Sequence, residues 1–431
     1  MLELKELRKD PKGCEARLKN KVPEVSLAEI ISVDEQARAL KTEVDQLKSH
    51  LNTSSKEIGK KMKNGEDIDS FKKELSALSD QIADKDKQAS LLDAKLKELL
   101  EVLPNFPMDD VPVAESAADN KLIKTQGTKP VFDFPVLDHV ALNDKLKLFD
   151  FARGAKIAGS GWPLYTDRGA RLEWALLNYM LDVQRKNGFI QIMPPLLVRK
   201  EIMYGCGQLP KFESQLFKLT DADFNHYLIP TSEVPICGMH YDEILDEAEL
   251  PLKYAAYTPC FRREAGGGRK NEKGLIRTHQ FNKVEMFAFT KPEDSPAMHQ
   301  LMLDSAEEVL QGLGIHYRNM LLTTGDMSFA AGKTVDIEAW LPAMVNAGNT
   351  LGDYKEVSSV SNCTDFQARR SLIRYRPNGE KTAFVHTLNG SGLATSRVMV
   401  ALLETHQQAD GSILVPKVLH RYLGTDMEVI R

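Results

Sequence analysis

Apolar residues recur at alternating intervals of three and four along two long stretches between Ala28 and Leu103. The first stripe contains Ile30, Val33, Ala37, Leu40, Val44, Leu47 and Leu51, and Ile58 and Met62 extend it. The second contains Leu75, Leu78, Ile82, Ala89, Leu92, Leu96, Leu99 and Leu103, with Lys85 at one seam position. A three–four repeat keeps one apolar face of a helix toward a partner helix. The pattern therefore predicts two long helices packed along this seam.

The residues between the two stripes predict a tight turn. Segment 63–67 reads Lys-Asn-Gly-Glu-Asp, and Asn-Gly is a strong turn signal. A short turn between two seamed helices predicts an antiparallel hairpin. Asp67 or Asp69 could cap the second helix, and Pro104 and Pro107 end it. Such a hairpin could be a spacer, a dimerisation arm or a binding arm. Its exposed positions mix both charge signs, as solvated helices commonly do.

The pattern changes after residue 105. Residues 106–134 are rich in Pro, Asp, Ala and Lys and lack periodicity, so we expect a linker. From residue 135 to Arg431, helical patterns mix with short apolar runs, which predicts an α+β domain with antiparallel strands. Leu172–Lys186 is predicted to be an amphipathic helix. The predicted strands are Ile190–Val198, Leu275–Thr290, Val335–Leu341 and Ala383–Leu388.

Composition narrows the class of protein. The chain has 431 residues, of which 42% are hydrophobic, enough for two domains with buried cores. Its formal net charge is -5, so any RNA contact requires a local positive face. Neither an apolar signal segment nor a membrane span is predicted. The five cysteines form no CxxC pair, which favours free thiols in a cytoplasmic protein over a zinc site.

Segment 257–289 contains the densest set of candidate site residues. Two apolar stretches flank a polar middle with Gly266–Gly268, which predicts a hairpin with a long loop. Side chains at even offsets share one face of each predicted strand: Arg262 and Glu264 on the first, and Arg277, Phe281 and Glu285 on the second. This face could be a surface ladder of ion pairs. It could also be a site where arginines meet phosphate, a ring meets a base and a carboxylate meets an ammonium group.

Three motifs, in their usual order, resemble those of the class II aminoacyl-tRNA synthetases in the seryl form. The matching segments are Lys186–Phe189 with Met193–Pro195 for motif 1, Phe261–Glu264, Arg277–Phe281 and Val284–Glu285 for motif 2, and Gly390–Arg397 for motif 3. Motif combinations in the right order are far more specific than any single motif. Nearly the whole chain, the helical hairpin included, is similar to the bacterial-type seryl-tRNA synthetases.

Further segments narrow the resemblance to the seryl enzymes. They are Thr231–Glu233 after Tyr227–Pro230, Glu356–Ser359 with Ser361–Asn362 and Asp365–Arg370, and Thr387–Ser391. The first resembles the family's Thr-Ser-Glu loop, the second its metal- and ATP-binding strand, and the third the strand that lines its serine pocket. Taken alone, Thr231 could cap a helix and Glu356 could be an exposed strand carboxylate.

The resemblance implies an α+β fold in three parts. Residues 1–105 would form a tRNA-binding domain with an antiparallel coiled-coil arm, 106–134 a linker, and 135–431 a catalytic domain with an antiparallel sheet flanked by helices. The implied activity is an ATP- and Mg²⁺-dependent serine–tRNA ligase. It would charge tRNA(Ser), and tRNA(Sec) where that RNA exists. The implied partners are L-serine, tRNA on the coiled coil, and a second subunit around Pro195, with no membrane.

The resemblance also implies roles for the residues that match its motifs, with Arg262 and Arg397 as catalytic residues. Those implied to bind ATP are Arg262, Arg263, Glu264, Arg277, Thr278, Phe281, Glu356, Val357, Ser358, Ser359 and Arg397. Those implied to bind serine are Thr231, Ser232, Glu233, Arg262, Glu285, Asn389 and Ser391. Glu356 and Ser359 are implied to hold Mg²⁺. A guanidinium fork suits bidentate contact with phosphate and carboxylate.

Departures and alternatives accompany this interpretation. Arg263 stands where the family commonly has serine, and Trp162–Asp167 is an unusual stretch. A non-catalytic RNA-binding paralogue would have no need of the motif arginines and carboxylates that this chain retains. An aminoacyl transferase to a carrier protein should lack the helical arm. A purely structural coiled-coil protein leaves the long C-terminal domain unexplained.

Overall fold

A computed structural model describes residues 1–63, 69–221, 224–265, 273–345, 348, 350–377, 379 and 381–431. The chain divides into two compact units, Met1–Pro104 and Asn105–Arg431. The two predicted features at Asn64–Gly65 and Gly266–Gly268 lie outside the described residues. Within the described part, no helix is both long and apolar enough to cross a bilayer.

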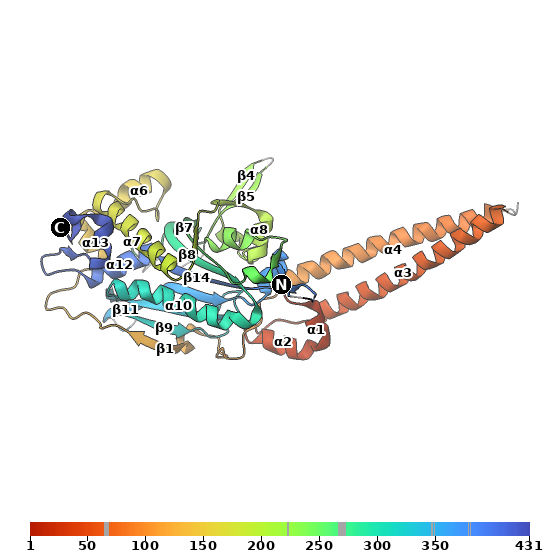
Figure 1. The fold of residues 1–431 in the computed structure, drawn as a ribbon, viewed down its shortest axis with the longest axis horizontal. Helices are drawn as coiled ribbons and strands as arrows, with labels where there is room; N and C mark the ends of the chain where they lie inside the picture. Colours follow the sequence, from red (N-terminus) through yellow and green to blue (C-terminus); the bar gives the residue numbers. More distant parts are fainter. Residues whose placement is uncertain are drawn as a thin grey trace. The chain divides into compact units, whose positions relative to one another are not determined.

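The first unit contains the predicted pair of long helices (Figure 1). Its helices are α1 (Leu4–Lys9), α2 (Pro11–Lys19), α3 (Ala28–Lys63) and α4 (Asp69–Glu101). The Lys41 ammonium lies 2.7 Å from the Asp93 carboxylate, and Lys48 lies 2.8 Å from Asp86. A later residue on α3 thus pairs with an earlier one on α4, so the helices are antiparallel. Seam residues such as Val44 and Leu96 are buried, as the three–four repeat predicts.

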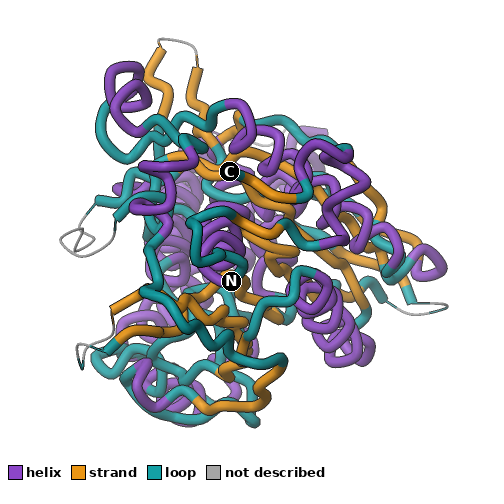
Figure 2. The backbone as a smooth tube through the Cα atoms, turned by 90° about the vertical axis from the view of Figure 1, so that its left-hand side faces the viewer, coloured by secondary structure: helices purple, strands orange, loops and turns teal. Residues whose placement is uncertain are grey.

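An eight-stranded sheet forms the centre of the second unit, and its strands lie among helices in Figure 2. All neighbouring strands in it are antiparallel except β2, which pairs in parallel with β7. Its strand order is β1 (Lys121–Gln126), β9 (Tyr317–Leu321), β10 (Lys333–Val345), β11 (Leu351–Asn362), β14 (His386–Ala394), β8 (Gln280–Thr290), β7 (Leu252–Phe261) and β2 (Ile190–Ile192).

The alternation of side chains along β8 explains how the sheet is covered. Even-numbered residues such as Val284 and Met286 join the core beneath helices α7 (Asp167–Lys186), α10 (Ser295–Gly312) and α12 (Thr395–Thr405). Odd-numbered Phe287 and Phe289 join a second core, on the opposite face. Residues 281, 283 and 285 share this odd-numbered face and are polar or aromatic. The same strand therefore supplies both an apolar core and a site.

Smaller elements surround the sheet. The remaining helices are α5 (His139–Leu146), α6 (Phe151–Ala158), α8 (Lys200–Cys206), α9 (Glu233–Gly238), α11 (Phe366–Ser371) and α13 (Lys417–Leu423). Three small sheets are β3 (Leu197–Arg199) with β5 (Phe224–Leu228) and β4 (Lys218–Asp221), β13 (Ala383–Phe384) with β12 (Arg374–Arg376) and β6 (Ile244–Asp246), and β15 (Ile413–Leu414) with β16 (Val429–Ile430). Helices α8, α9 and α11 cover the second core.

Several predicted boundaries are wrong. Ile190–Val198 is not one strand, because Pro194 and Pro195 interrupt it and separate β2 from β3. The strand predicted to begin at Leu275 begins at Gln280. The segment expected as a linker contains β1, whose six residues are all exposed, so burial leaves no periodic signal in the sequence. The run Ala383–Leu388 is divided between β13 and β14.

Candidate active site

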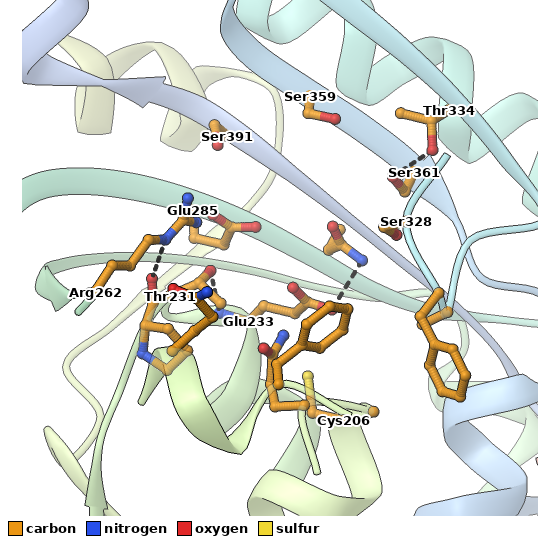
Figure 3. Close-up of a pocket in the computed structure, with 18 of the residues that line it drawn as sticks. Cys206, Thr231, Glu233, Arg262, Glu285, Ser328, Thr334, Ser359, Ser361 and Ser391 are labelled. Atoms are coloured by element: carbon orange, nitrogen blue, oxygen red, sulfur yellow. Dashed lines mark hydrogen bonds between the residues drawn. The ribbon is translucent and has the colours of Figure 1, made fainter. Parts of the chain in front are cut away.

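A cavity of about 560 Å³ opens on the odd-numbered face of β8. A smaller hollow of about 90 Å³ adjoins it and shares six lining residues with it. The shared residues are Arg262, Glu264, Arg277, Lys283, Glu356 and Ser391. In Figure 3, Arg262, Thr231, Glu233 and Glu285 cluster at one end, and Ser359, Ser361 and Thr334 lie at the other. The site thus has two ends of different chemistry.

The first end is built around a buried ion pair. Lys283 pairs with Glu285, and both side chains are almost inaccessible to solvent. The Lys283 ammonium also donates a hydrogen bond to the Thr231 hydroxyl, over 2.8 Å. Separating a buried pair of opposite charges is costly, because each charge would be left without a partner. Thr231, Lys283 and Glu285 therefore form one polar wall with a fixed geometry.

Glu233 lies at the same end, at the start of α9. Its Oε1 accepts hydrogen bonds from the side-chain amides of Gln367, over 2.6 Å, and Asn389, over 3.1 Å. Burial, and then the nearby negative charge of Glu285, raises the pKa of Glu233. A carboxylate in this environment gains from a cationic ligand group, such as an ammonium.

Arginines from three segments surround the middle of the site. The Arg262 guanidinium lies 5.2 Å from the centre of the Phe281 ring and donates to the Pro230 carbonyl oxygen, over 3.3 Å. Arg277 donates to the Glu264 carboxylate over 2.5 Å. Arg397, in the first turn of α12, lies 3.4 Å from the Glu356 carboxylate. These cations suit a polyanion, and the exposed face of a ring beside them suits a base.

A β-bulge brings Glu356 and Ser359 to the same cavity. Residues three apart on a regular strand point to opposite faces. Between β10 and β11, Ile337 pairs with Ser358 whereas Glu338 pairs with Glu356, so Val357 is an extra residue. Both Glu356 and Ser359 consequently line the cavity, while Val357 joins the apolar core.

Asp336 extends this second, acidic end of the cavity. It pairs with Ser359 across the two strands, and its Oδ1 is buried without a hydrogen-bond partner among the described residues. Burial, and then the charge of Glu356, raises the pKa of Asp336 well above its usual range. Two carboxylates this close gain from a shared cation. No group of three His, Cys, Asp or Glu side chains in the described part is arranged to hold a metal alone.

Two family models match the chain. The model of the seryl-tRNA synthetase N-terminal domain matches residues 1–107. The model of the class II tRNA synthetase core domain, for the G, H, P, S and T enzymes, matches residues 216–406. A serine–tRNA ligase of Chlamydia caviae is 51% identical over 98% of both chains. The chain belongs to the seryl-tRNA synthetase family.

Solved structures of the seryl-tRNA synthetase family have the same fold. The seryl-tRNA synthetase of Pyrococcus horikoshii, complexed with ATP, has a TM-score of 0.91 and 36% identity, covering 100% of this chain and 99% of that chain. The cytoplasmic serine–tRNA ligase of Naegleria fowleri, in complex with AMP, has a TM-score of 0.82 and 31% identity, covering 94% and 91%. The predicted fold class, a coiled-coil arm with a class II sheet domain, is confirmed.

Most of the site residues predicted from this family's motifs line the two cavities. They are Thr231, Glu233, Arg262, Glu264, Arg277, Thr278, Phe281, Glu285, Glu356, Val357, Ser359, Asn389, Ser391 and Arg397. Three predicted residues do not belong to either lining. Ser358 donates to the Ser391 carbonyl oxygen over 2.6 Å, the Ser232 hydroxyl lies 2.6 Å from that of Thr258, and Arg263 is exposed. The two serines therefore form hydrogen bonds beside the site and do not line the cavities.

Lys283 and Asp336 are among the polar residues of the cavity that the family motifs left out. Lys283 lies between Phe281 and Glu285 at an even offset, so the alternation that grouped those two also included it. Asp336 had no such signal, because its place opposite Ser359 depends on the pairing of two strands.

Proposed function

We propose that this chain activates L-serine with ATP and transfers it to tRNA(Ser). Family membership supports the reaction class. The geometry that supports this substrate pair is the cavity with an arginine-rich middle, an acidic end at Glu356 and a polar end at Glu285. These features match a polyphosphate, a cation and a small polar amino acid, respectively.

In the first step, a serine carboxylate oxygen attacks the α-phosphorus of ATP. A bond forms between them, the bond to the β-phosphate bridging oxygen breaks, and seryl-adenylate and pyrophosphate result. Arg262 would hold the α-phosphate and the serine carboxylate together with its guanidinium fork. Arg277 and Arg397 would hold the outer phosphates, and adenine would stack on Phe281. No protein nucleophile is required, so positioning and charge stabilisation account for catalysis.

Serine is selected at the polar end. The serine ammonium would meet Glu233 and Thr231, and its hydroxyl would meet Glu285 and Ser391. Alanine lacks that hydroxyl and would leave buried polar groups unpaired, at about 1–3 kcal/mol for each group. The Lys283–Glu285 pair fixes the position of the carboxylate that discriminates.

A magnesium ion fits the acidic end. Glu356 and Ser359 offer oxygen atoms on one face, and beside them lies the buried Oδ1 of Asp336, which has no hydrogen-bond partner among the described residues; oxygen donors of this kind suit Mg²⁺. Bound Mg²⁺ would neutralise the phosphate charge of ATP. With only these protein groups, the remaining ligands would be phosphate oxygens and water.

The second step needs tRNA, and the arm is proposed to bind it. A terminal hydroxyl of the tRNA attacks the seryl carbonyl carbon, and AMP leaves. The α3–α4 arm would contact the backbone of the long variable arm of tRNA(Ser), chiefly by shape. Family resemblance extends the proposal to tRNA(Sec), which a separate charging assay with purified tRNA(Sec) tests.

The motif 1 region is proposed to form a homodimer. β2 is an edge strand, and the apolar side chains of Ile190 and Met193 are 56% and 86% exposed. An unpaired strand edge with apolar neighbours favours pairing with a second copy. We expect Met193→Glu to lower the mass measured by light scattering from that of a dimer toward that of a monomer.

Pyrophosphate exchange with each proteinogenic amino acid tests the proposed function. We expect exchange only with serine, followed by charging of a subset of unfractionated tRNA. Tight tRNA binding without exchange would favour the non-catalytic paralogue. Exchange followed by transfer to a carrier protein, with no charged tRNA, would favour the carrier-directed enzyme. The five cysteines are buried and free, which fits a reducing cytoplasm. The assay should therefore be run under reducing conditions.

A further inference from the structure

A buried carboxylate outside the cavity connects all three motif regions. Glu173 lies on α7, the helix that leads into motif 1, and is 4% exposed. Isolated carboxylates are rarely buried, because the charged form loses its hydration. A fully buried one therefore needs hydrogen-bond donors, and those donors identify what it holds.

The donors to Glu173 come from the two other motifs. Asn282 on β8 donates from Nδ2 to Oε1 of Glu173, over 2.8 Å. The Thr395 hydroxyl, at the start of α12, donates a short hydrogen bond to the same oxygen. That hydroxyl also lies 3.0 Å from the Asn282 carbonyl oxygen, so the three residues form one compact cluster. Each contact joins elements that are far apart in the sequence.

The two donors stand directly beside site residues. Asn282 lies between Phe281 and Lys283, and its side chain points away from the cavity because strand residues alternate. Thr395 is two residues before Arg397 in the first turn of α12. A displacement of either donor would move the Phe281 ring or the Arg397 guanidinium, which line the smaller hollow.

We propose that Glu173 is a positioning residue, which fixes Phe281 and Arg397 for ATP through Asn282 and Thr395. The inference rests on the proposed binding of ATP in this cavity. It assigns to Glu173 no contact with substrate. Its effect should therefore appear in the affinity for ATP, and any oxygen that accepts both hydrogen bonds should preserve it.

Titration calorimetry with ATP tests the proposal in the full-length protein. Glu173→Leu removes the acceptor and should weaken ATP binding by about tenfold, since Asn282 and Thr395 both lose the oxygen that joins them to α7. Glu173→Gln retains an oxygen acceptor and should weaken binding by no more than about twofold. Thr395→Val removes a single donor and should weaken ATP binding by an intermediate factor. If Glu173→Leu does not fold, the ATP affinity of Thr395→Val tests the proposal.

Glu307→Leu is the matched control. Glu307 is also a buried helical carboxylate, and it accepts from Tyr317 and Asn319, but it lines neither cavity. Its substitution should lower stability and leave the ATP affinity unchanged. The proposal is overturned if Thr395→Val and any folded Glu173→Leu bind ATP like the wild type. It is also overturned if Glu307→Leu weakens binding as much as they do. Loss of serine-dependent exchange in the wild type would contradict only the proposed function.

Discussion

At the scale of single residues, Arg262 has the largest predicted effect on catalysis. Its guanidinium lies over Phe281 and beside the polar end, where nucleotide and amino acid must meet. We expect Arg262→Ala to lower serine-dependent pyrophosphate exchange by at least about a hundredfold. Arg262→Lys keeps the charge but loses the fork, so it should recover only part of this loss. Substantial exchange by a folded Arg262→Ala protein would remove the assigned role.

Glu173 makes stability depend on pH. Burial raises its pKa from 4.5 to about 7, although hydrogen bonds from Thr395 and Asn282 oppose that shift. The titratable groups that interact with it are the phenols of Tyr165 and Tyr257, and burial raises the pKa of both. In the unfolded chain Glu173 ionises at lower pH than in the fold. This group's contribution to stability therefore falls as pH rises from about 4.5 to about 7, then levels off.

Glu173→Gln should remove that pH dependence. The unfolding free energy of Glu173→Gln minus that of the wild type should rise by roughly 2–3 kcal/mol from pH 4.5 to pH 8, because the variant buries no charge at this position. Chemical unfolding curves at several pH values measure this difference. Parallel pH profiles for the two proteins would show that Glu173 titrates normally in the fold.

At the scale of elements, the coiled-coil arm offers a matched pair of leucines. Leu96 is 8% exposed and lies in the seam, whereas Leu91 on the same helix is 64% exposed. Leu96→Ala should destabilise the arm by about 2–4 kcal/mol, and Leu91→Ala should change little. Hydrogen exchange within residues 28–101 distinguishes them. If tRNA binds the arm, only Leu96→Ala should slow charging, and equal effects would contradict a buried seam.

Prediction of elements succeeded where one face of an element is buried continuously. The seams of α3 and α4 and the apolar stripe of α7 repeat with the period of a helix, so their positions follow from the sequence. β1 escaped detection because its pairing with β9 uses backbone atoms and leaves every side chain exposed. β7 ends at Phe261 and β8 begins at Gln280, so Arg262, Glu264 and Arg277, which were expected on strands, lie outside both strands and line the cavity.

At the scale of the whole molecule, separate tasks are expected of the two compact units. The Lys41–Asp93 ion pair shows where the two helices lie side by side, so a short turn can replace residues 42–92 there. This shortened arm should impair tRNA charging far more than serine-dependent pyrophosphate exchange. Equal loss in both assays, with the fold of the second unit intact by circular dichroism, would contradict separate tasks.

The sequence alone determined the helical hairpin, the α+β class and the motif residues that line the site, because periodicity and motif order are properties of neighbours along the chain. Only the tertiary structure decided that Glu356 and Ser359 share a face, since the bulge at Val357 exists in the pairing of β11 with β10. It alone likewise set Asp336 opposite Ser359 and buried Glu173 between Asn282 and Thr395. Those arrangements join residues that are distant in the chain, and no local pattern records them.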